Sequence, residues 1–189
     1  MSDDIIINGE VVSRSEMFST PERCLALVKH NPIYLQDMPE NMKTYMVCLE
    51  AIKNSKTRNI LPYVPELLRS TELYTEYAKK YKYALHEIPE EIQTYEMCLY
   101  CVKNYGESLE IVPEKYKTPE LCLEAIENTF GEALMYTPEK YKTFGLCLRA
   151  ISRSKSVQDW AEFISLSVPK KHQTLEFYAA LIETQMWEK

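Results

Sequence analysis

Glycine is scarce in this sequence, with 4 residues among 189, and histidine is scarcer still, with 3. So few glycines argue against Gly-rich phosphate loops and against a fold with many tight turns. No apolar run approaches the roughly 18 residues that a membrane-spanning helix needs. The start, MSDD, lacks the basic and apolar regions of a signal peptide. We therefore expect a cytoplasmic protein without a membrane segment.

Positive charge is also in short supply over most of the chain. The net charge is −6; residues 140–189 hold 8 Lys/Arg against 5 Asp/Glu, a net +3, which leaves −9 on residues 1–139. A general DNA- or RNA-binding protein normally presents a basic stripe. The charge balance therefore disfavours nucleic acid as a partner, although a helical repeat protein that reads one base per repeat stays an alternative.

The chain does contain a repeated string. VPEKYKT (112–118) and TPEKYKT (137–143) differ at one position, and a Leu-Cys-Leu run follows each. With the Thr of this string as position 0, position +4 is usually Cys, position +7 is small or apolar, and a proline precedes the next start. The predicted starts are Thr20, Thr44, Thr71, Thr94, Thr118, Thr143 and Thr174, and the prolines are Pro39, Pro65, Pro89, Pro113, Pro138 and Pro169. This self-similarity indicates a repeat protein.

Each repeat has the pattern of two short helices. In TPELCLEAIEN (118–128), Thr118 suits the N-cap and Pro119 the first helical position, and apolar residues follow at helical spacing. A second, shorter helix follows, as in GESLEIV (106–112), and PEKY adds one more turn. Helices of about ten residues are marginal alone and become stable by stacking. We therefore predict an all-α fold, an α-solenoid of about six to seven two-helix repeats of about 24 residues each.

The two ends depart from the repeat. Residues 4–12, DIIINGEVV, place Asn8-Gly9 between β-branched runs, which predicts a small β-hairpin. We expect residues 1–19 to form an N-terminal cap, residues 20–173 the helical repeat array, and residues 174–189 a C-terminal capping helix.

The stretches GESLEIVPEKYKTPELCLEAIEN (106–128) and GEALMYTPEKYKTFGLCLRAI (131–151) resemble the bacterial and viral tandem-repeat family of unknown function numbered 4116. The likeness is good over residues 94–151, fair over 20–93 and weak at both ends. It implies an all-helical repeat domain of the kind appended to host-interacting bacterial proteins. It implies no catalytic residues.

Candidates for chemistry are few. Cys98 and Cys101 form a C-x-x-C, but both fall on core positions of the repeat, so we expect packing rather than zinc or redox chemistry. His172 stands where the other repeats have Tyr116 and Tyr141, and we expect it to play their packing role. No Ser-His, Cys-His or carboxylate-pair constellation stands out. We therefore predict no catalytic residues, no metal and no cofactor, with an enzyme site assembled across the repeats as the alternative.

Two departures from the repeat are candidates for binding a partner. At positions +6 and +9 the third and fourth repeats carry Tyr77, Lys80, Tyr100 and Lys103, aromatic and cationic side chains on one helix face. They fit either a protein interface or an ordinary solvated face.

The second departure is basic. Arg149, Arg153 and Lys155 precede an insertion that contains Trp160. This segment fits either a docking site for an acidic partner or a helix end with the cations that its dipole favours. Together these features predict a non-enzymatic protein–protein interaction module, and an effector- or phage-type inhibitor role suits the family resemblance.

Overall fold

The computed structural model describes residues 5–7, 10–12, 16–154 and 160–187. Short α-helices that pack on their neighbours, together with 3-10 helices, make up most of it, which confirms the predicted all-α class. No helix within these residues is long and apolar enough to cross a membrane. The chain divides into two compact units, Met1–Ala84 and Leu85–Lys189.

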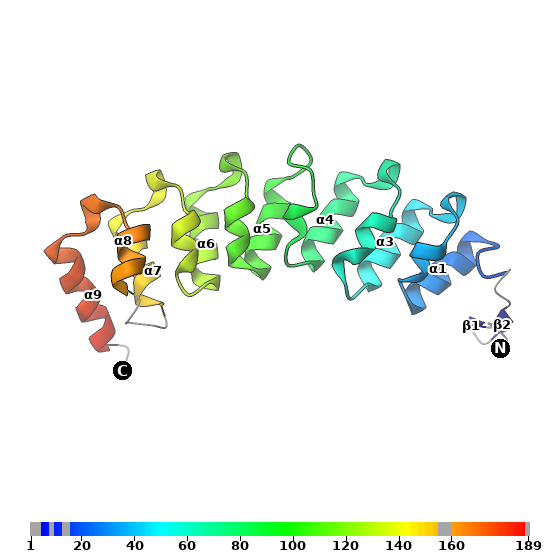
Figure 1. The fold of residues 1–189 in the computed structure, drawn as a ribbon, viewed down its shortest axis with the longest axis horizontal. Coiled ribbons are helices and arrows are strands. Elements are labelled where there is room, and N and C mark those ends of the chain that lie inside the picture. Colours follow the sequence, from blue (N-terminus) through cyan, green and yellow to red (C-terminus); the bar gives the residue numbers. More distant parts are fainter. Residues whose placement is uncertain (1–4, 8–9, 13–15, 155–159, 188–189) are drawn as a thin grey trace. The chain divides into compact units, whose positions relative to one another are not determined.

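In the first unit α1 packs on α3, and α3 packs on α4 (Figure 1). Its α-helices are α1 (Pro21–His30), α2 (Tyr34–Asp37), α3 (Tyr45–Asn54) and α4 (Thr71–Lys80). Its 3-10 helices are η1 (Glu40–Met42), η2 (Arg58–Tyr63) and η3 (Glu66–Leu68). A further 3-10 helix, η4 (Ala84–His86), spans the unit boundary in the sequence.

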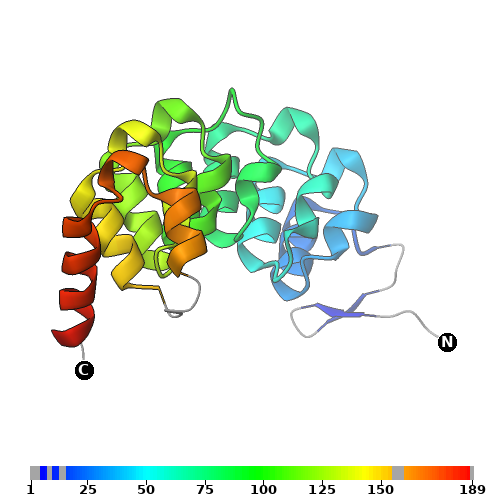
Figure 2. The ribbon, with the colours of Figure 1, turned by 60° about the vertical axis from the view of Figure 1, so that its left-hand side comes forward.

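In the second unit α5 packs on α6, α6 on α7, and α7 on α9 (Figure 2). Its α-helices are α5 (Tyr95–Asn104), α6 (Pro119–Asn128), α7 (Phe144–Ser152), α8 (Trp160–Ser167) and α9 (Leu175–Trp187). Its 3-10 helices are η5 (Gly106–Ile111), η6 (Glu114–Tyr116), η7 (Glu132–Tyr136), η8 (Glu139–Tyr141) and η9 (Lys170–His172). The second helix predicted from GESLEIV thus forms as a 3-10 helix, and PEKY forms the extra turn.

A hydroxyl side chain begins each of seven α-helices. Its oxygen accepts a hydrogen bond from the backbone N–H three residues later, at 3.2–3.4 Å, and so satisfies a donor that the helix leaves unpaired. The start residues are Thr20, Thr44, Ser70, Thr94, Thr118, Thr143 and Thr174. The predicted start Thr71 is therefore wrong by one residue, since Ser70 is the cap and Thr71 the first residue of α4. Positions below are counted from these seven caps.

Positions +4 and +8 form the core between successive helices. From α1 to α7 the side chain at +8 is completely buried, and the side chain at +4 is at most 3% exposed. The +4 residues are Cys24, Cys48, Tyr74, Cys98, Cys122 and Cys147, and the +8 residues are Val28, Ile52, Ala78, Val102, Ile126 and Ile151. Burying a larger apolar side chain contributes roughly 1.5–3 kcal/mol. Stacking therefore stabilises helices that are too short to be stable alone.

Two three-residue strands precede the helices. β1 (Ile5–Ile7) pairs with β2 (Glu10–Val12) in antiparallel register, with Ile6 opposite Val11. Asn8 and Gly9, predicted to form the turn, lie outside the described residues. The capping role of residues 1–19 stays a prediction.

Candidate functional site

Tyr77 was expected on an exposed face, and this is wrong. Its side chain is fully buried, its hydroxyl donates to the carbonyl of Arg58 at 3.0 Å, and its ring lies 4.6 Å from the ring of Tyr81. The reason is the one-residue shift in the repeat, because counting from Ser70 places Tyr77 at position +7 with Ala51 and Ala125 rather than at +6. The predicted patch of Tyr77, Lys80, Tyr100 and Lys103 therefore lacks one of its two aromatic anchors.

The other three members of that patch remain on the surface. Lys80 is exposed at position +10, where partial burial lowers the pKa of its ammonium group. Tyr100 is half-buried and Lys103 is exposed, at positions +6 and +9 of α5. This pair stays a predicted contact for a partner.

The predicted basic segment is engaged within the protein. The Glu127 carboxylate forms ion pairs with Arg149 and with Arg153, the latter at 2.9 Å, and Arg153 also donates to the Glu127 carbonyl at 3.2 Å. These contacts join α7 to α6 and favour the interpretation as a helix end. Lys155 lies outside the described residues, and Trp160 is described only as the first residue of α8.

The C-x-x-C cysteines lie in the core, as predicted. Cys98 and Cys101 are fully buried, and desolvation raises the pKa of their thiols to about 12 and about 11. All six cysteines are buried free thiols. The reactive thiolate is therefore disfavoured at neutral pH. No cluster of three or more His, Cys, Asp or Glu side chains suited to a metal ion occurs among the residues that the structure describes.

His172 takes the place of tyrosine, as predicted. Its Nε2 lies 3.0 Å from the carbonyl oxygen of Lys142, and the Tyr116 hydroxyl donates to the carbonyl of Gln93 at 2.9 Å. Both acceptors are the residue just before the N-cap of the preceding repeat. An imidazole and a phenol thus make the same contact between layers.

A second contact between layers comes from position +10. In three helices the side chain at this position donates to carbonyl groups at the C-terminal end of the preceding helix, which a helix leaves without partners. The donors are Lys80 on α4, Asn128 on α6 and Arg153 on α7, and the acceptors are the carbonyls of Lys53, of Val102 and Lys103, and of Glu127. The bonds from Asn128 are 3.3 Å long.

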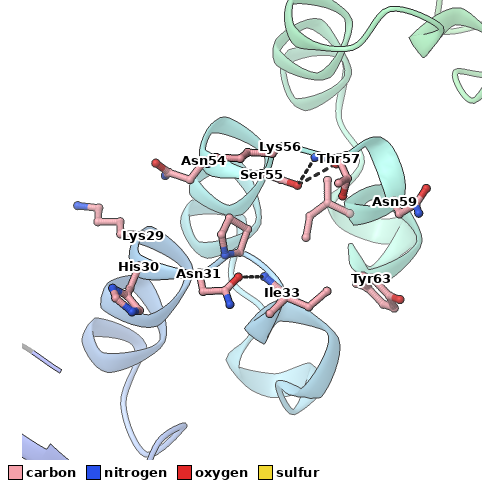
Figure 3. A pocket seen from close by; sticks show the side chains of 12 residues that line it. Lys29, His30, Asn31, Ile33, Asn54, Ser55, Lys56, Thr57, Asn59 and Tyr63 are labelled. Atoms are coloured by element: carbon pink, nitrogen blue, oxygen red, sulfur yellow. Dashed lines mark hydrogen bonds between the residues drawn. The ribbon is translucent and has the colours of Figure 1, made fainter. Parts of the chain in front are cut away.

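The step from α1 to α3 lacks this contact. Asn54, at position +10 of α3, donates instead to the carbonyl and the carboxylate of Glu50 in its own helix, at 2.8 Å in each case. A pocket of about 650 Å³ lies at the C-terminal ends of these two helices (Figure 3). The pocket therefore lies at a step where the +10 side chain stays on its own helix, as Thr184 of α9 also does by donating to the Leu181 carbonyl at 2.9 Å.

Basic and amide side chains surround the pocket. Lys29 and His30 line it from α1, and Lys56 lines it from the turn after α3. Amides come from Asn31, Asn54 and Asn59, and apolar groups from Pro32, Ile33 and Ile60. None of the residues that line the pocket is Asp or Glu. The pocket is thus suited to a ligand that carries negative charge or accepts hydrogen bonds.

Comparison of the chain with models of protein families, with curated proteins and with solved structures finds no match. The resemblance noted from the sequence therefore stays a prediction. The pocket was not predicted, because its residues follow the repeat pattern. A proline at position +12, Pro32, where α5 is followed by Gly106, is the one signal that could have marked this step.

Proposed function

We propose that this chain is an α-solenoid scaffold that binds a partner protein without catalysing a reaction, and that the α1–α3 pocket receives an acidic segment of that partner. One observation supports the proposal. The pocket lies where the +10 contact between layers is missing, and it is lined by cations and amides with no carboxylate. At this step the +10 side chain does not join the ends of the two helices, and a pocket lies between them instead.

The charges around the pocket favour an anion. Lys29 and Lys56 contribute two positive charges. The C-terminal ends of α1 and α3 oppose them with roughly −0.5 charge each. Over the lining side chains and the two helix ends the sum is positive by about one unit. The Glu50 carboxylate, which accepts from Asn54 at 2.8 Å, does not line the pocket. A carboxylate is therefore favoured over a cation.

The remaining lining residues favour a peptide over a free anion. Ile33 is 50% exposed at the pocket and can contact an apolar side chain of the ligand. Asn59 and the Tyr63 hydroxyl can bond to peptide groups. A segment that alternates acidic and apolar residues satisfies both kinds of group.

The proposal can be tested with a fluorescein-labelled peptide of alternating Asp and Leu as the probe. We expect the intact chain to bind it, and the Lys29→Glu/Lys56→Glu variant to bind about tenfold more weakly, because two attractions become repulsions. Fluorescence anisotropy measures both affinities. Lys103→Glu, a change of the same kind at position +9 of the other unit, is the matched control and should bind like the intact chain.

Three results would count against the pocket. Equal binding of a Lys-Leu peptide would show that charge does not select the ligand. Unchanged affinity in Lys29→Glu/Lys56→Glu would place the probe elsewhere. A loss confined to Lys103→Glu would instead support the surface of Tyr100 and Lys103 predicted from the sequence.

A further inference from the structure

Helix α9 exposes large apolar side chains to solvent. Leu175 is 90% exposed, Tyr178 40% and Ile182 60%. Phe177 and Leu181, on the adjacent side of the helix, are 0% and 2% exposed and belong to the core. Figure 2 shows α9 at the edge of the second unit, next to α7. One side of α9 is thus anchored, and the adjacent side presents an apolar stripe to solvent.

Two of the three stripe positions are buried on the other helices. Tyr178 and Ile182 stand at positions +4 and +8, which from α1 to α7 are at most 3% exposed. In the second unit these side chains are buried where successive helices pack, as α6 packs on α5 and α7 on α6. The α9 stripe, defined by Leu175, Tyr178 and Ile182, is therefore a surface of the kind that receives a helix.

Two carboxylates lie along one edge of α9, beside the stripe. Glu176 and Glu183 are exposed and lie seven residues apart, so they share one edge of α9 beside the stripe. From this arrangement we infer that the α9 stripe binds an amphipathic helix of a partner protein, with an apolar face that covers the stripe and Lys or Arg along the edge that meets Glu176 and Glu183. This surface lies in the second unit, and the inference does not depend on the pocket of the first.

A second copy of the chain fits the stripe less well. In an antiparallel pair of identical helices each edge lies opposite its own counterpart, so Glu176 and Glu183 would face the same carboxylates. Head-to-tail stacking would need a free face at α1. Met17 and Phe18 already pack against Leu27 and Ala26 on that helix. A basic partner helix meets neither obstacle.

The test uses two synthetic helical peptides of about 18 residues, long enough to hold helical structure. They share a Leu/Ala stripe, and one has Lys and the other Glu along its edges. We expect the intact chain to bind the Lys peptide about fivefold more tightly than the Glu peptide, the effect of two exposed ion pairs. Glu176→Lys/Glu183→Lys should reverse this preference, and Leu175→Asp/Ile182→Asp should lose both peptides.

The control variants show whether peptide binding is specific to the α9 stripe. Met46→Asp changes a residue that is 57% exposed in the first unit and should bind like the intact chain. Circular dichroism should show that every variant keeps its helices. Equal affinity for both peptides, or binding that survives Leu175→Asp/Ile182→Asp, would overturn the inference.

Sedimentation velocity tests whether a second copy of the chain covers the α9 stripe. A dimer that Leu175→Asp/Ile182→Asp abolishes would show that a second copy covers the stripe, and this too would overturn the inference. Lys29→Glu/Lys56→Glu should leave binding of the Lys peptide unchanged. This variant therefore distinguishes a failure of the proposed pocket site from a failure of the proposed α9 site.

Discussion

The α1–α3 step and the α5–α6 step use the same positions of the repeat with different results. Both asparagines donate to the Glu carboxylate four residues earlier, Asn128 to Glu124 and Asn54 to Glu50. Asn128 also crosses to the carbonyls of Val102 and Lys103, whereas Asn54 bonds only within its own helix. The residue type and its position in the helix are identical. The difference therefore comes from the surroundings of each asparagine rather than from the asparagine itself.

The residue at position +12 differs between these two steps. Gly106 follows α5, and a Cβ there would lie 2.5 Å from the carbonyl oxygen of Ala125 on α6, closer than real contacts allow. Only a residue without a side chain permits this spacing. The corresponding residue after α1 is Pro32, whose ring lines the pocket. Position +12 is Lys56 after α3 and Phe130 after α6, and Lys80 and Arg153 still make the contact at those steps. Glycine at +12 is therefore a requirement of the α5–α6 step, and Pro32 is a feature of the α1–α3 step.

The two units also differ in buried thiols, which predicts different sensitivity to alkali. Cys48 in the first unit and Cys98, Cys101 and Cys147 in the second have thiol pKa values raised by burial to about 11 or 12. The unfolded chain releases these protons near its usual thiol pKa of about 8.5. Unfolding then releases protons, so stability falls as the pH rises above about 8.5, by about 1.4 kcal/mol per pH unit for each thiol.

Cysteine variants measure each contribution. Cys98→Ala/Cys101→Ala should remove about two thiol equivalents from the pH dependence of the unfolding free energy between pH 9 and 10.5, and Cys48→Ala about one. Urea titrations followed by circular dichroism at several pH values give these slopes. Identical slopes in both variants and the intact chain would show that the thiols ionise alike in the folded and unfolded states.

A side chain added at Gly131 should push α7 away from the turn that packs against it. Gly131 has φ of 95°, and a Cβ there would lie 1.9 Å from the carbonyl oxygen of Ala150 on α7. Gly131→Ala should therefore cost about 3 kcal/mol or more, from backbone strain and from displacement of the next helix. Gly145→Ala is the matched control, because its Cβ would meet nothing within 4 Å and it lies inside α7. It should gain about 0.5 kcal/mol in a denaturant titration, and an equal loss in both variants would contradict the tight contact.

Structural features that depend on residues close together in the sequence could be predicted. Features that depend on contacts between successive helices could not. The Thr caps, the proline stops and the buried cysteines follow from local hydrogen bonding and helical periodicity. Tyr77 was misplaced because Ser70 and Thr71 are adjacent and either hydroxyl can cap a helix. The structure resolves this ambiguity in favour of Ser70, with the hydrogen bond to the N–H of Leu73.

The candidate sites depend on contacts that no single repeat encodes. Asn54 and Asn128 are the same residue at the same position, so the sequence of the helix does not reveal which one crosses to its neighbour. Likewise Tyr178 and Ile182 continue the apolar pattern of the core, and only the packing of α9 shows that they lie in solvent. A binding surface that depends on how helices pack therefore cannot be predicted from the repeat pattern alone.

A pair of alanine variants measures the contrast between the two asparagines. Asn128→Ala removes bonds between layers and leaves carbonyls of α5 without this donor, so it should cost about 1–2 kcal/mol. Asn54→Ala removes bonds within one exposed helix and should cost about 0.5 kcal/mol. Thermal and urea unfolding of both variants give the two values. An equal cost would mean that the bonds across the α5–α6 step contribute no more than local ones.

The smallest expected effect comes from a substitution that would restore the missing hydrogen bond from α3 to α1. Asn54→Gln keeps the amide neutral but adds one methylene group, which extends its reach toward the C-terminal end of α1. We expect a gain of about 0.5 kcal/mol if the longer amide makes the contact that Asn128 makes on α6. The Asp-Leu probe should bind more weakly, because the amide now occupies the pocket while its charge is unchanged. Asn54→Ser, which is shorter, should keep probe binding and lose a little stability. Probe binding that is unaffected by Asn54→Gln would show that the ligand site does not depend on the missing contact between α1 and α3.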